Sequence, residues 1–374
     1  MPWNWELASW PKFNYEVDQI TQMEKQFLLN IGSASAYLKT IEDEKDYYRF
    51  IVEILSLEGL ENAKIEGEIL DRESLQSSIK RQFGLTTGSK RKPVREAHMA
   101  ELLCDVYKSF DQPLTHEMLW RWHSMLFKDF YSPADCGKYR THQEPMQIVS
   151  SRYGSSKVFF EAPPSKRVFR EMTTFIDWIN STTNFKSILG KAAITHVYFE
   201  SIHPFEDGNG RIGRILVEKI LSQGVGRSIL IAISRTLEQK KKEYYSALEN
   251  CNRTLEVQKW VEFFANAVLK AEQESMSLLY FLIEKSKMLN SFSEQINPRQ
   301  TKVLLRMFEE GPNGFKGGLS AENYIAITKT TRATTTRDLT DLVKKKALVK
   351  TGKLRHTRYW LNLSRKHGLK KTIK

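Results

Sequence analysis

Apolar residues recur at every third or fourth position along most of this chain, which is the spacing of one face of an α-helix. Residues 31–85 follow this pattern, and residues 97–130 predict two further helices. Residues 168–200 predict two more, and residues 257–290 predict one long helical stretch. The chain is therefore predicted to be mainly α-helical.

The helical spacing is lost between residues 131 and 166, where glycine and proline are frequent. Two short runs inside this part, residues 146–149 and 157–161, are apolar and suit β-strands. We predict that they pair as a small β-hairpin. A surface hairpin without a role in function is the alternative.

Residues 297–374 follow a different pattern from the rest of the chain. Two helical patterns are followed by a third that is rich in threonine and contains Arg332 and Arg337. Residues 348–350 and 359–361 then suit the strands of a second hairpin. Three helices followed by a hairpin predict a winged helix-turn-helix domain.

Positive charge is concentrated in this C-terminal segment. The chain has a formal net charge of +13 at pH 7. Residues 297–374 hold 19 Lys and Arg against 5 Asp and Glu, a net of +14, whereas the remainder holds 38 against 39, a net of −1. We therefore expect a polyanion such as DNA or RNA to bind at residues 297–374. Winged domains also bind proteins or form dimers, so a protein partner and a homodimer remain alternatives.

Length and composition favour a globular protein of two or three domains. With 374 residues, 41% hydrophobic and 27% charged, the chain can form more than one core. We predict an N-terminal helical segment over 1–96, a core over 97–290 and the winged domain over 297–374. No apolar run approaches the ~18 residues of a membrane span, so no membrane is expected as a partner.

Cysteine usage and the N-terminus favour a cytoplasmic protein. The N-terminus lacks the basic and apolar regions of a signal peptide. Cys104, Cys136 and Cys251 are far apart and odd in number, so they predict neither a metal site nor a disulfide framework. Trp3, Trp5 and Trp10 could form a binding surface, but we expect aromatic residues there to pin the terminal segment onto a core.

Residues 203–214 carry the chemistry that this chain offers, in the order His-Pro-Phe-Glu-Asp-Gly-Asn-Gly-Arg-Ile-Gly-Arg. They lie between two apolar helical runs. Pro204 stops the first helix, and Gly208 and Gly210 permit backbone angles that would strain other residues. Such a loop can point successive N–H groups at an anion, at the positive end of the following helix.

The side chains of this segment add to the anion site. His203 titrates near neutral pH, as a general base should, and Asp207 is an oxygen ligand suited to Mg²⁺ beside phosphates. Arg211 and Arg214 are three residues apart, so both can lean toward the loop. Taken singly, each residue is more often structural, but the ordered set indicates phosphoryl or nucleotidyl transfer.

The segment closely resembles the signature of the Fic family, His-Pro-Phe-x-(Asp/Glu)-Gly-Asn-Gly-Arg-x-x-Arg, and every fixed position is present. Family members transfer AMP from ATP to a hydroxyl side chain of a target protein, or less often another phosphate-containing group. The resemblance implies a nucleotidyltransferase with a Fic-type helical core and a small hairpin flap. It also implies that His203 is the catalytic base and that Asp207 holds Mg²⁺. The ATP-binding residues that it implies are Gly208, Asn209, Gly210, Arg211, Ile212, Gly213, Arg214, Tyr245 and Asn252.

Two of these residues, and the flap, lie outside the signature. Tyr245 and Asn252 are seven residues apart, as on one helical face, and match the family residues that contact adenosine. In the family the flap pairs with the backbone of the target and holds the modified side chain near the base. The flap residues implied here are Val158, Phe159, Phe160 and Glu161.

A second motif precedes the core. Residues 62–67 resemble the Fic inhibitory motif (Ser/Thr)-x-x-x-Glu-(Gly/Asn). Glu66 and Gly67 match, whereas Asn62 departs from the Ser or Thr of the family. The resemblance implies that Glu66 pairs with Arg214 and inhibits transfer. The aromatic N-terminus likewise resembles a domain of unknown function that precedes Fic cores.

Two other functions remain open on this sequence. A Fic enzyme can also remove AMP, with Glu66 activating a water, or can act in both directions. Alternatively, the chain is a DNA-binding regulator whose Fic-derived core senses a ligand. The target carries a Tyr, Thr or Ser hydroxyl and could be the protein itself.

Overall fold

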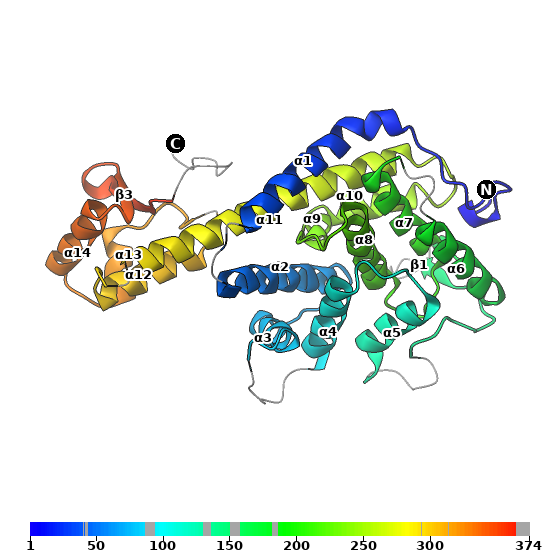
Figure 1. The fold of residues 1–374 in the computed structure, drawn as a ribbon, viewed down its shortest axis with the longest axis horizontal. Coiled ribbons are helices and arrows are strands. Elements are labelled where there is room, and N and C mark those ends of the chain that lie inside the picture. The colour runs from blue at the N-terminus through cyan, green and yellow to red at the C-terminus, as the bar shows by residue number, and fades with distance from the viewer. Residues whose placement is uncertain are drawn as a thin grey trace. The chain divides into compact units, whose positions relative to one another are not determined.

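The computed structural model describes residues 1–39, 41, 44–86, 94–129, 136–149, 158–181, 186–292, 294–312 and 314–363. The chain is mainly α-helical with small hairpin sheets, as the spacing of apolar residues predicted (Figure 1). It divides into two compact units. The larger unit comprises residues 1–37 and 51–273, and the C-terminal unit comprises 38–50 and 274–374. Among the helices that the structure describes, none combines the length and apolar character that a membrane span requires.

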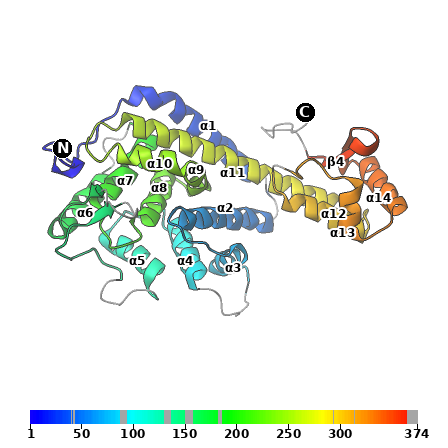
Figure 2. The same ribbon diagram turned by 180° about the vertical axis from the view of Figure 1, so that it is seen from behind.

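Helices build the larger unit around a buried pair, α7 and α8, which lie side by side (Figures 1 and 2). Most residues of both helices are buried, because apolar side chains surround them on several faces. Two short 3-10 helices, Asn4–Glu6 and Val17–Ile20, precede the α-helices. The α-helices are α1 (Thr21–Leu38), α2 (Glu44–Ile65), α3 (Arg72–Gln82), α4 (Val94–Lys108), α5 (His116–Phe127), α6 (Ser165–Asn180), α7 (Ile188–Ile202), α8 (Asn209–Val225), α9 (Ile233–Gln239), α10 (Lys241–Glu249) and α11 (Gln258–Phe292). The first residues of α2, 44–50, and the last part of α11 belong to the C-terminal unit.

The predicted flap hairpin is present. Strands β1 (Gln147–Val149) and β2 (Val158–Glu161) pair antiparallel, with Ile148 opposite Phe160. Lys157, which the sequence placed in the second strand, lies outside the described residues. All three residues of β1 are exposed, so this strand presents its side chains to solvent.

The N-terminal tryptophans pin the first residues onto the hairpin and onto α6, as expected. The indole N–H of Trp5 donates to the carbonyl of Glu161 at 2.7 Å, and Trp3 meets the Phe160 ring edge-on with centroids 5.4 Å apart. Trp10 donates to the carboxylate of Glu171 on α6 at 2.9 Å. Burial of the rings and satisfied N–H groups together hold this segment in place.

The C-terminal unit contains the three helices and the hairpin that the sequence predicted. These are α12 (Pro298–Glu309), α13 (Ala321–Thr328), α14 (Arg332–Lys344), β3 (Leu348–Thr351), a 3-10 helix (Leu354–His356) and β4 (Arg358–Leu361). β3 and β4 pair antiparallel, and Leu319 forms a bridge with Tyr359. Apolar residues of α12, α13, α14 and β3 share one core with Phe281 and Met288 from the end of α11. The assignment of this unit as a winged domain stays a prediction.

Candidate active site

His203 stands at the end of α7 in a conformation that its neighbours enforce. Its backbone is left-handed, with φ 50° and ψ 60°, and its N–H donates to the carbonyl of Phe199 at 3.0 Å. A non-glycine residue in this region is uncommon, and it persists only where the surroundings fix it. Pro204 follows and prevents the helix from continuing.

Arg140 is the residue that fixes this turn. Its Nε donates to the carbonyl of His203 at 2.8 Å, and its Nη2 donates to the carbonyl of Ile202 at 3.3 Å. Its own N–H donates to the carbonyl of Pro204 at 2.9 Å, and its Nη1 donates to the hydroxyl of Ser165 at 3.0 Å. The side chain is buried, so these carbonyls replace the water that would otherwise solvate the guanidinium.

The imidazole of His203 is held neutral at physiological pH. Burial, and then the positive charge of Arg140, lower the pKa of His203 to about 4. The carboxylate of Glu200 lies 3.8 Å from Nδ1, and burial raises the pKa of Glu200 to about 8. A neutral imidazole has a nitrogen lone pair and can accept a proton from a bound hydroxyl.

The loop after His203 leads directly into α8. Gly208 precedes the helix with φ 79°, where a Cβ would collide with the ring of Phe127. The amide of Asn209 spans the loop, since its Oδ1 accepts from the N–H of Phe205 at 2.9 Å and its Nδ2 donates to the same residue's carbonyl at 2.8 Å. The loop is therefore preformed, and the first N–H groups of α8 are left to meet an anion.

Arg214 is buried on α8 and bound by two residues from the end of α2. Its Nη2 lies 2.8 Å from Oε1 of Glu66, which is the contact that the inhibitory motif implies. Its Nε and Nη2 donate to the Oδ1 of Asn62 at 3.1 and 2.8 Å. Asn62 therefore binds the arginine directly in the place of the family's Ser or Thr. Gly210 leaves room for the Glu66 carboxylate, which a Cβ there would strike.

Arg211, the first arginine of the segment, is also paired. Its Nη1 lies 2.9 Å from Oε1 of Glu68, and its Nη2 lies 3.4 Å from Oδ1 of Asp207. Its guanidinium packs over the Phe127 ring, with 4.7 Å from Cζ to the centroid. Both arginines of the signature thus meet carboxylates from one short stretch, residues 66–68.

An apolar cavity of about 740 Å³ lies at the end of α7, where Glu200 and Ser201 line it. The flap contributes Phe159 to it, α7 contributes Glu200, and the chain around α10 contributes Tyr245 and Asn252. The Nδ2 of Asn252 donates to the carbonyl of Phe159 at 3.0 Å and so ties the flap to the cavity. A space of this size, apolar with a few polar groups at its edge, suits a small organic ligand.

A smaller cavity of about 360 Å³ is lined by Asp207, Arg211, Glu68 and Arg95, among others. The Asp207 side chain is 55% exposed, so its carboxylate can reach a ligand. Among the residues that the structure describes, no group of three or more His, Cys, Asp and Glu side chains could hold a metal ion. One carboxylate nevertheless suits Mg²⁺ when phosphate oxygens and water complete its shell, so the donor set fits a metal that arrives with a nucleotide.

Comparison with known families accounts for this geometry. The model of the Fic/DOC family matches residues 113–221, which include the whole loop and most of α8. The chain is a Fic domain protein. Residues 3–85 match a second model, a domain of unknown function, DUF4172, so the segment carrying Glu66 lies in a different family module from the loop that it contacts.

Curated relatives of this Fic protein share modest identity over part of their length. A protein named "Probable protein adenylyltransferase" from Aquifex aeolicus (strain VF5) is 26% identical over 181 residues, which is 48% of this chain and 50% of the relative. A protein adenylyltransferase Fic from Nematostella vectensis is 30% identical over 128 residues, 33% of this chain and 28% of the relative. The chain thus spans half or less of the length of these relatives.

A solved structure shows the same fold over nearly the whole chain. The crystal structure of a Fic family protein from Desulfovibrio desulfuricans G20 superimposes with a TM-score of 0.55 at 20% identity. The match covers 96% of this chain and 99% of that one. The likeness therefore extends from the Fic core into both flanking parts of the sequence.

The structure brings most of the predicted site residues together. His203, the glycine loop, both arginines and Glu66 meet at the start of α8, and the flap adjoins Tyr245. One geometric expectation was wrong: α10 ends at Glu249, so Asn252 lies in the following turn and not on the same helical face. It still lines the cavity with Tyr245. Phe159 and Phe160 both line the cavity, and Phe160 also packs against Trp5.

The sequence analysis assigned no role to three residues of the site. Arg140 lies in the irregular stretch before the flap, where no pattern marks it. Glu200 stands three residues before His203, so helical spacing alone could have placed the two together. Glu68 follows Glu66 by two residues, and its acidity beside the inhibitory motif was the available signal.

Proposed function

We propose that this chain is a protein adenylyltransferase, which transfers AMP from ATP to a Tyr, Thr or Ser hydroxyl of a target protein and is inhibited by Glu66. The observation that carries the proposal is a neutral, partly buried His203 at the mouth of a preformed anion loop. The Fic/DOC match and the relatives named as adenylyltransferases support the same reaction.

ATP would span two cavities, the smaller one lined by Asp207 and Arg211 of the loop and the apolar one at the end of α7. The apolar cavity can take the adenosine, with the ring of Tyr245 available for stacking and the amide of Asn252 near its edge. The N–H groups of Asn209 and Gly210 then face the α-phosphate at the positive end of α8. The N–H of Gly208 donates to Oδ1 of Asp207, so it can join them only when the Asp207 side chain turns away. Ile212 is fully buried and Gly213 packs close to Glu200, so these two residues position the helix and not the nucleotide.

The transfer step needs one base and positively charged groups that bind the leaving pyrophosphate. His203 accepts the hydroxyl proton while the hydroxyl oxygen bonds to the α-phosphorus, and the bond from that phosphorus to the bridging oxygen breaks. Pyrophosphate leaves with that electron pair, and Arg211 and Arg214 neutralise its charge. Asp207 would hold Mg²⁺ against the phosphates, where the bound ion offsets their negative charge.

Residues 66–68 contact Arg211 and Arg214, the two arginines that would bind pyrophosphate. Glu66 occupies Arg214 and Glu68 occupies Arg211, so both cations that would receive the leaving group are engaged before ATP arrives. ATP that binds without its terminal phosphates in place presents its α-phosphate in the wrong direction. Misorientation of this kind can cost about 10²-fold in rate. The flap places the target, since the exposed β1 strand can pair with an extended segment.

The test compares initial rates of AMP transfer from labelled ATP for wild type, Glu66→Gly and Glu66→Gly/His203→Ala. The single variant should modify itself or a lysate protein faster than wild type. Loss of the base should then lower the rate by on the order of 10²–10⁴-fold while ATP binding persists.

Other outcomes separate the alternatives. Equal rates for wild type and Glu66→Gly would make Glu66 an ordinary carboxylate. Release of AMP from a modified target that depends on Glu66 would assign the chain to AMP removal. No transfer by any variant would favour a ligand-sensing core.

A further inference from the structure

The C-terminal unit contains two helices joined by a tight turn. α13 ends at Thr328, Lys329 turns left-handed with φ 56°, and α14 begins at Arg332. Thr331 caps α14, because its hydroxyl accepts from the N–H of Thr334 at 3.3 Å. A turn of three residues between two packed helices is helix-turn-helix geometry, in which the second helix is the one presented to a partner.

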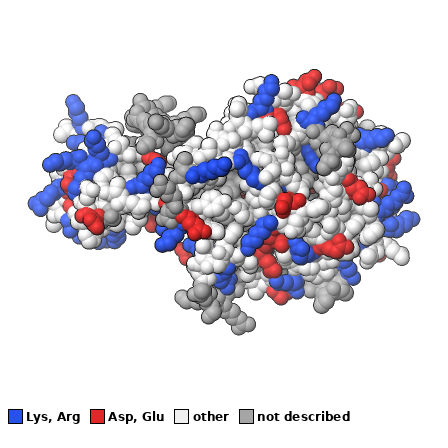
Figure 3. Space-filling model, viewed as in Figure 1, with Lys and Arg blue, Asp and Glu red and all other residues white. Residues whose placement is uncertain are grey.

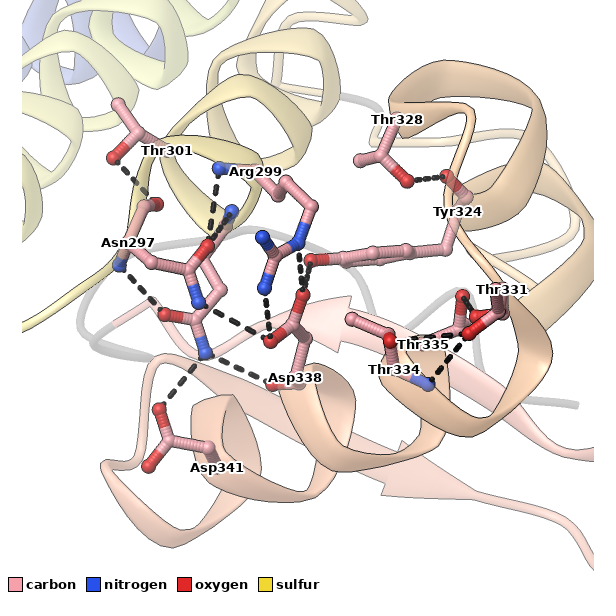
Figure 4. A network of polar contacts seen from close by, with 11 residues as sticks. Asn297, Arg299, Thr301, Tyr324, Thr328, Thr331, Thr334, Thr335, Asp338 and Asp341 are labelled. Atoms are coloured by element: carbon pink, nitrogen blue, oxygen red, sulfur yellow. Dashed lines mark hydrogen bonds and ion pairs between the residues drawn. The ribbon is translucent and has the colours of Figure 1, made fainter.

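One buried carboxylate sets which face of α14 points inward (Figure 4). Asp338 accepts from Nε of Arg299 at 2.9 Å, from the hydroxyl of Tyr324 at 2.8 Å and from Nδ2 of Asn297 at 3.1 Å. These partners come from α12, from α13 and from the residue before α12. The acid of α14 therefore faces the other helices, and its charge is already compensated there.

The negative charge of Asp341, the second acid of α14, is also paired with neighbouring groups. Asp341 accepts from Nε2 of Gln300 at 2.8 Å and lies 2.6 Å from Nζ of Lys345. Hydrogen bonds from Lys345 and Gln300 lower the pKa of Asp341, so it is ionised but paired. Hydrogen bonds from its own backbone and from Ser320 lower the pKa of Glu322 on α13, and the positive charge of Arg332 adds to this effect.

The outward face of α14 is basic and polar. Its exposed residues recur with helical spacing and include no acid and no large apolar side chain; they are Arg332, Ala333, Thr336, Arg337, Thr340 and Lys344. Protein interfaces depend on buried aromatic or apolar anchors, which this face lacks. Arginines and hydroxyls are the groups that contact phosphates and base edges.

The hairpin adds further basic side chains, beside the exposed apolar side chains of Leu354 and Val349. Lys350, Lys353 and Arg355 are exposed on and between β3 and β4. Figure 3 shows the surface of the C-terminal unit with more Lys and Arg than Asp and Glu. The local excess of positive charge in residues 297–374, +14, matches a polyanion and not a balanced protein surface.

We propose that α14 and the β3–β4 hairpin bind double-stranded DNA, with α14 in the major groove and the hairpin on the phosphate backbone. The major groove of B-DNA is about 12 Å wide and admits one helix, whereas that of duplex RNA is too narrow for side chains to read. This binding is independent of the proposed AMP transfer, because it uses none of the residues of that site.

Fluorescence anisotropy of the full chain on a labelled 24-base-pair DNA duplex tests the proposal. Affinity should fall as salt rises from 50 to 200 mM, because phosphate contacts release counterions. Arg332→Gln/Arg337→Gln should weaken binding on the order of 10- to 100-fold. The control, Lys287→Gln/Lys302→Gln, removes the same charge from exposed positions on α11 and α12 and should change affinity much less.

Three results would overturn the proposal. One is no binding by wild type at 10 µM protein and 50 mM salt, which is well inside the range of ordinary non-specific DNA affinity. Another is an equal loss in the two double variants, which would assign the effect to net charge and not to α14. The third is equal affinity for an RNA duplex of the same sequence. Far-UV circular dichroism of both variants would establish that they are folded.

Discussion

At the scale of single residues, the site depends on side chains that hold others in place. Arg140 makes no contact with a ligand in the proposed reaction, yet it binds the carbonyls on both sides of the His203 turn. It also places a positive charge near the imidazole. The geometry of the base therefore depends on one buried guanidinium, whose charge adds to the larger effect of burial in lowering the pKa of His203.

The pH dependence of transfer should reveal this environment. Burial and Arg140 disfavour the imidazolium of His203, while the Glu200 carbonyl, Glu66 and Asp207 favour it, and the net effect places its pKa at about 4. The neutral form is the active one, so transfer without Glu66 should persist as pH falls to about 5 and be lost at about 4 or below, because removing Glu66 removes a charge that favours the imidazolium. A pH–rate profile of Glu66→Gly measures this. A midpoint near 6.5, the ordinary value for histidine, would contradict it.

Asn62 offers a second test at this scale. It is fully buried and accepts two hydrogen bonds from Arg214 through its Oδ1. Asn62→Ala should lower the free energy of unfolding by about 1–3 kcal/mol, since a buried guanidinium loses its acceptors. Urea denaturation of this variant beside Asn266→Ala, an exposed asparagine, measures the difference. A loss no larger than that of the control would show that Arg214 finds other partners.

At the scale of elements, the important contact joins the end of α2 to the start of α8. α2 ends at Ile65, so Glu66 and Glu68 both follow the helix and lie on either side of Gly67, whose φ is 85°. The turn at Gly67 lets these two carboxylates reach Arg214 and Arg211, which are three residues apart on α8.

Glu68→Gln should raise AMP transfer above wild type, and by less than Glu66→Gly does. Its partner Arg211 keeps Asp207 at 3.4 Å, so one acid remains near that cation after the change. The isosteric glutamine removes charge without opening space. Initial rates of the two single variants and of the double variant provide the measurement, with Glu73→Gln, an exposed acid on α3, as control. A rate equal to that of the control would show that Glu68 takes no part in the inhibition of transfer.

The sequence predicted the positions of the helices better than it predicted which residues of different helices and loops contact each other. Helical spacing placed α4, α5, α6 and α7, and the loop signature placed His203, because local patterns encode both. Arg140 and Glu68 could not be assigned roles, since their partners are 63 and 143 residues away. Asn252 was assigned to a helical face that ends three residues earlier, because helix termination by weak caps leaves little trace in sequence.

At the scale of the whole molecule, the end of α11 belongs to the C-terminal core. Phe281 and Met288 are 3% and 7% exposed, and they pack with residues of α12 and α13. A chain ended at residue 296 keeps these apolar side chains but loses what covers them. Their exposure should favour association, since large apolar patches on soluble proteins do so.

We expect the chain ended at residue 296 to form larger species than the full chain. Size-exclusion chromatography with light scattering measures the mass of each. Phe281→Ser/Met288→Ser in the shortened chain should reduce that mass again, because it removes the apolar patch. Identical mass distributions for the full and shortened chains would contradict the prediction.

The two carboxylate–arginine pairs have a further consequence for how the protein would respond to its nucleotide supply. ATP phosphates and carboxylates compete for the same cations, so the apparent affinity for ATP is scaled by the fraction of molecules with both arginines open. If each partly exposed pair contributes about 1 kcal/mol, that fraction falls roughly 5-fold per pair and about 30-fold for both. Residues 66–68 would then set a concentration threshold, and the chain would respond to the ATP level before it meets any target.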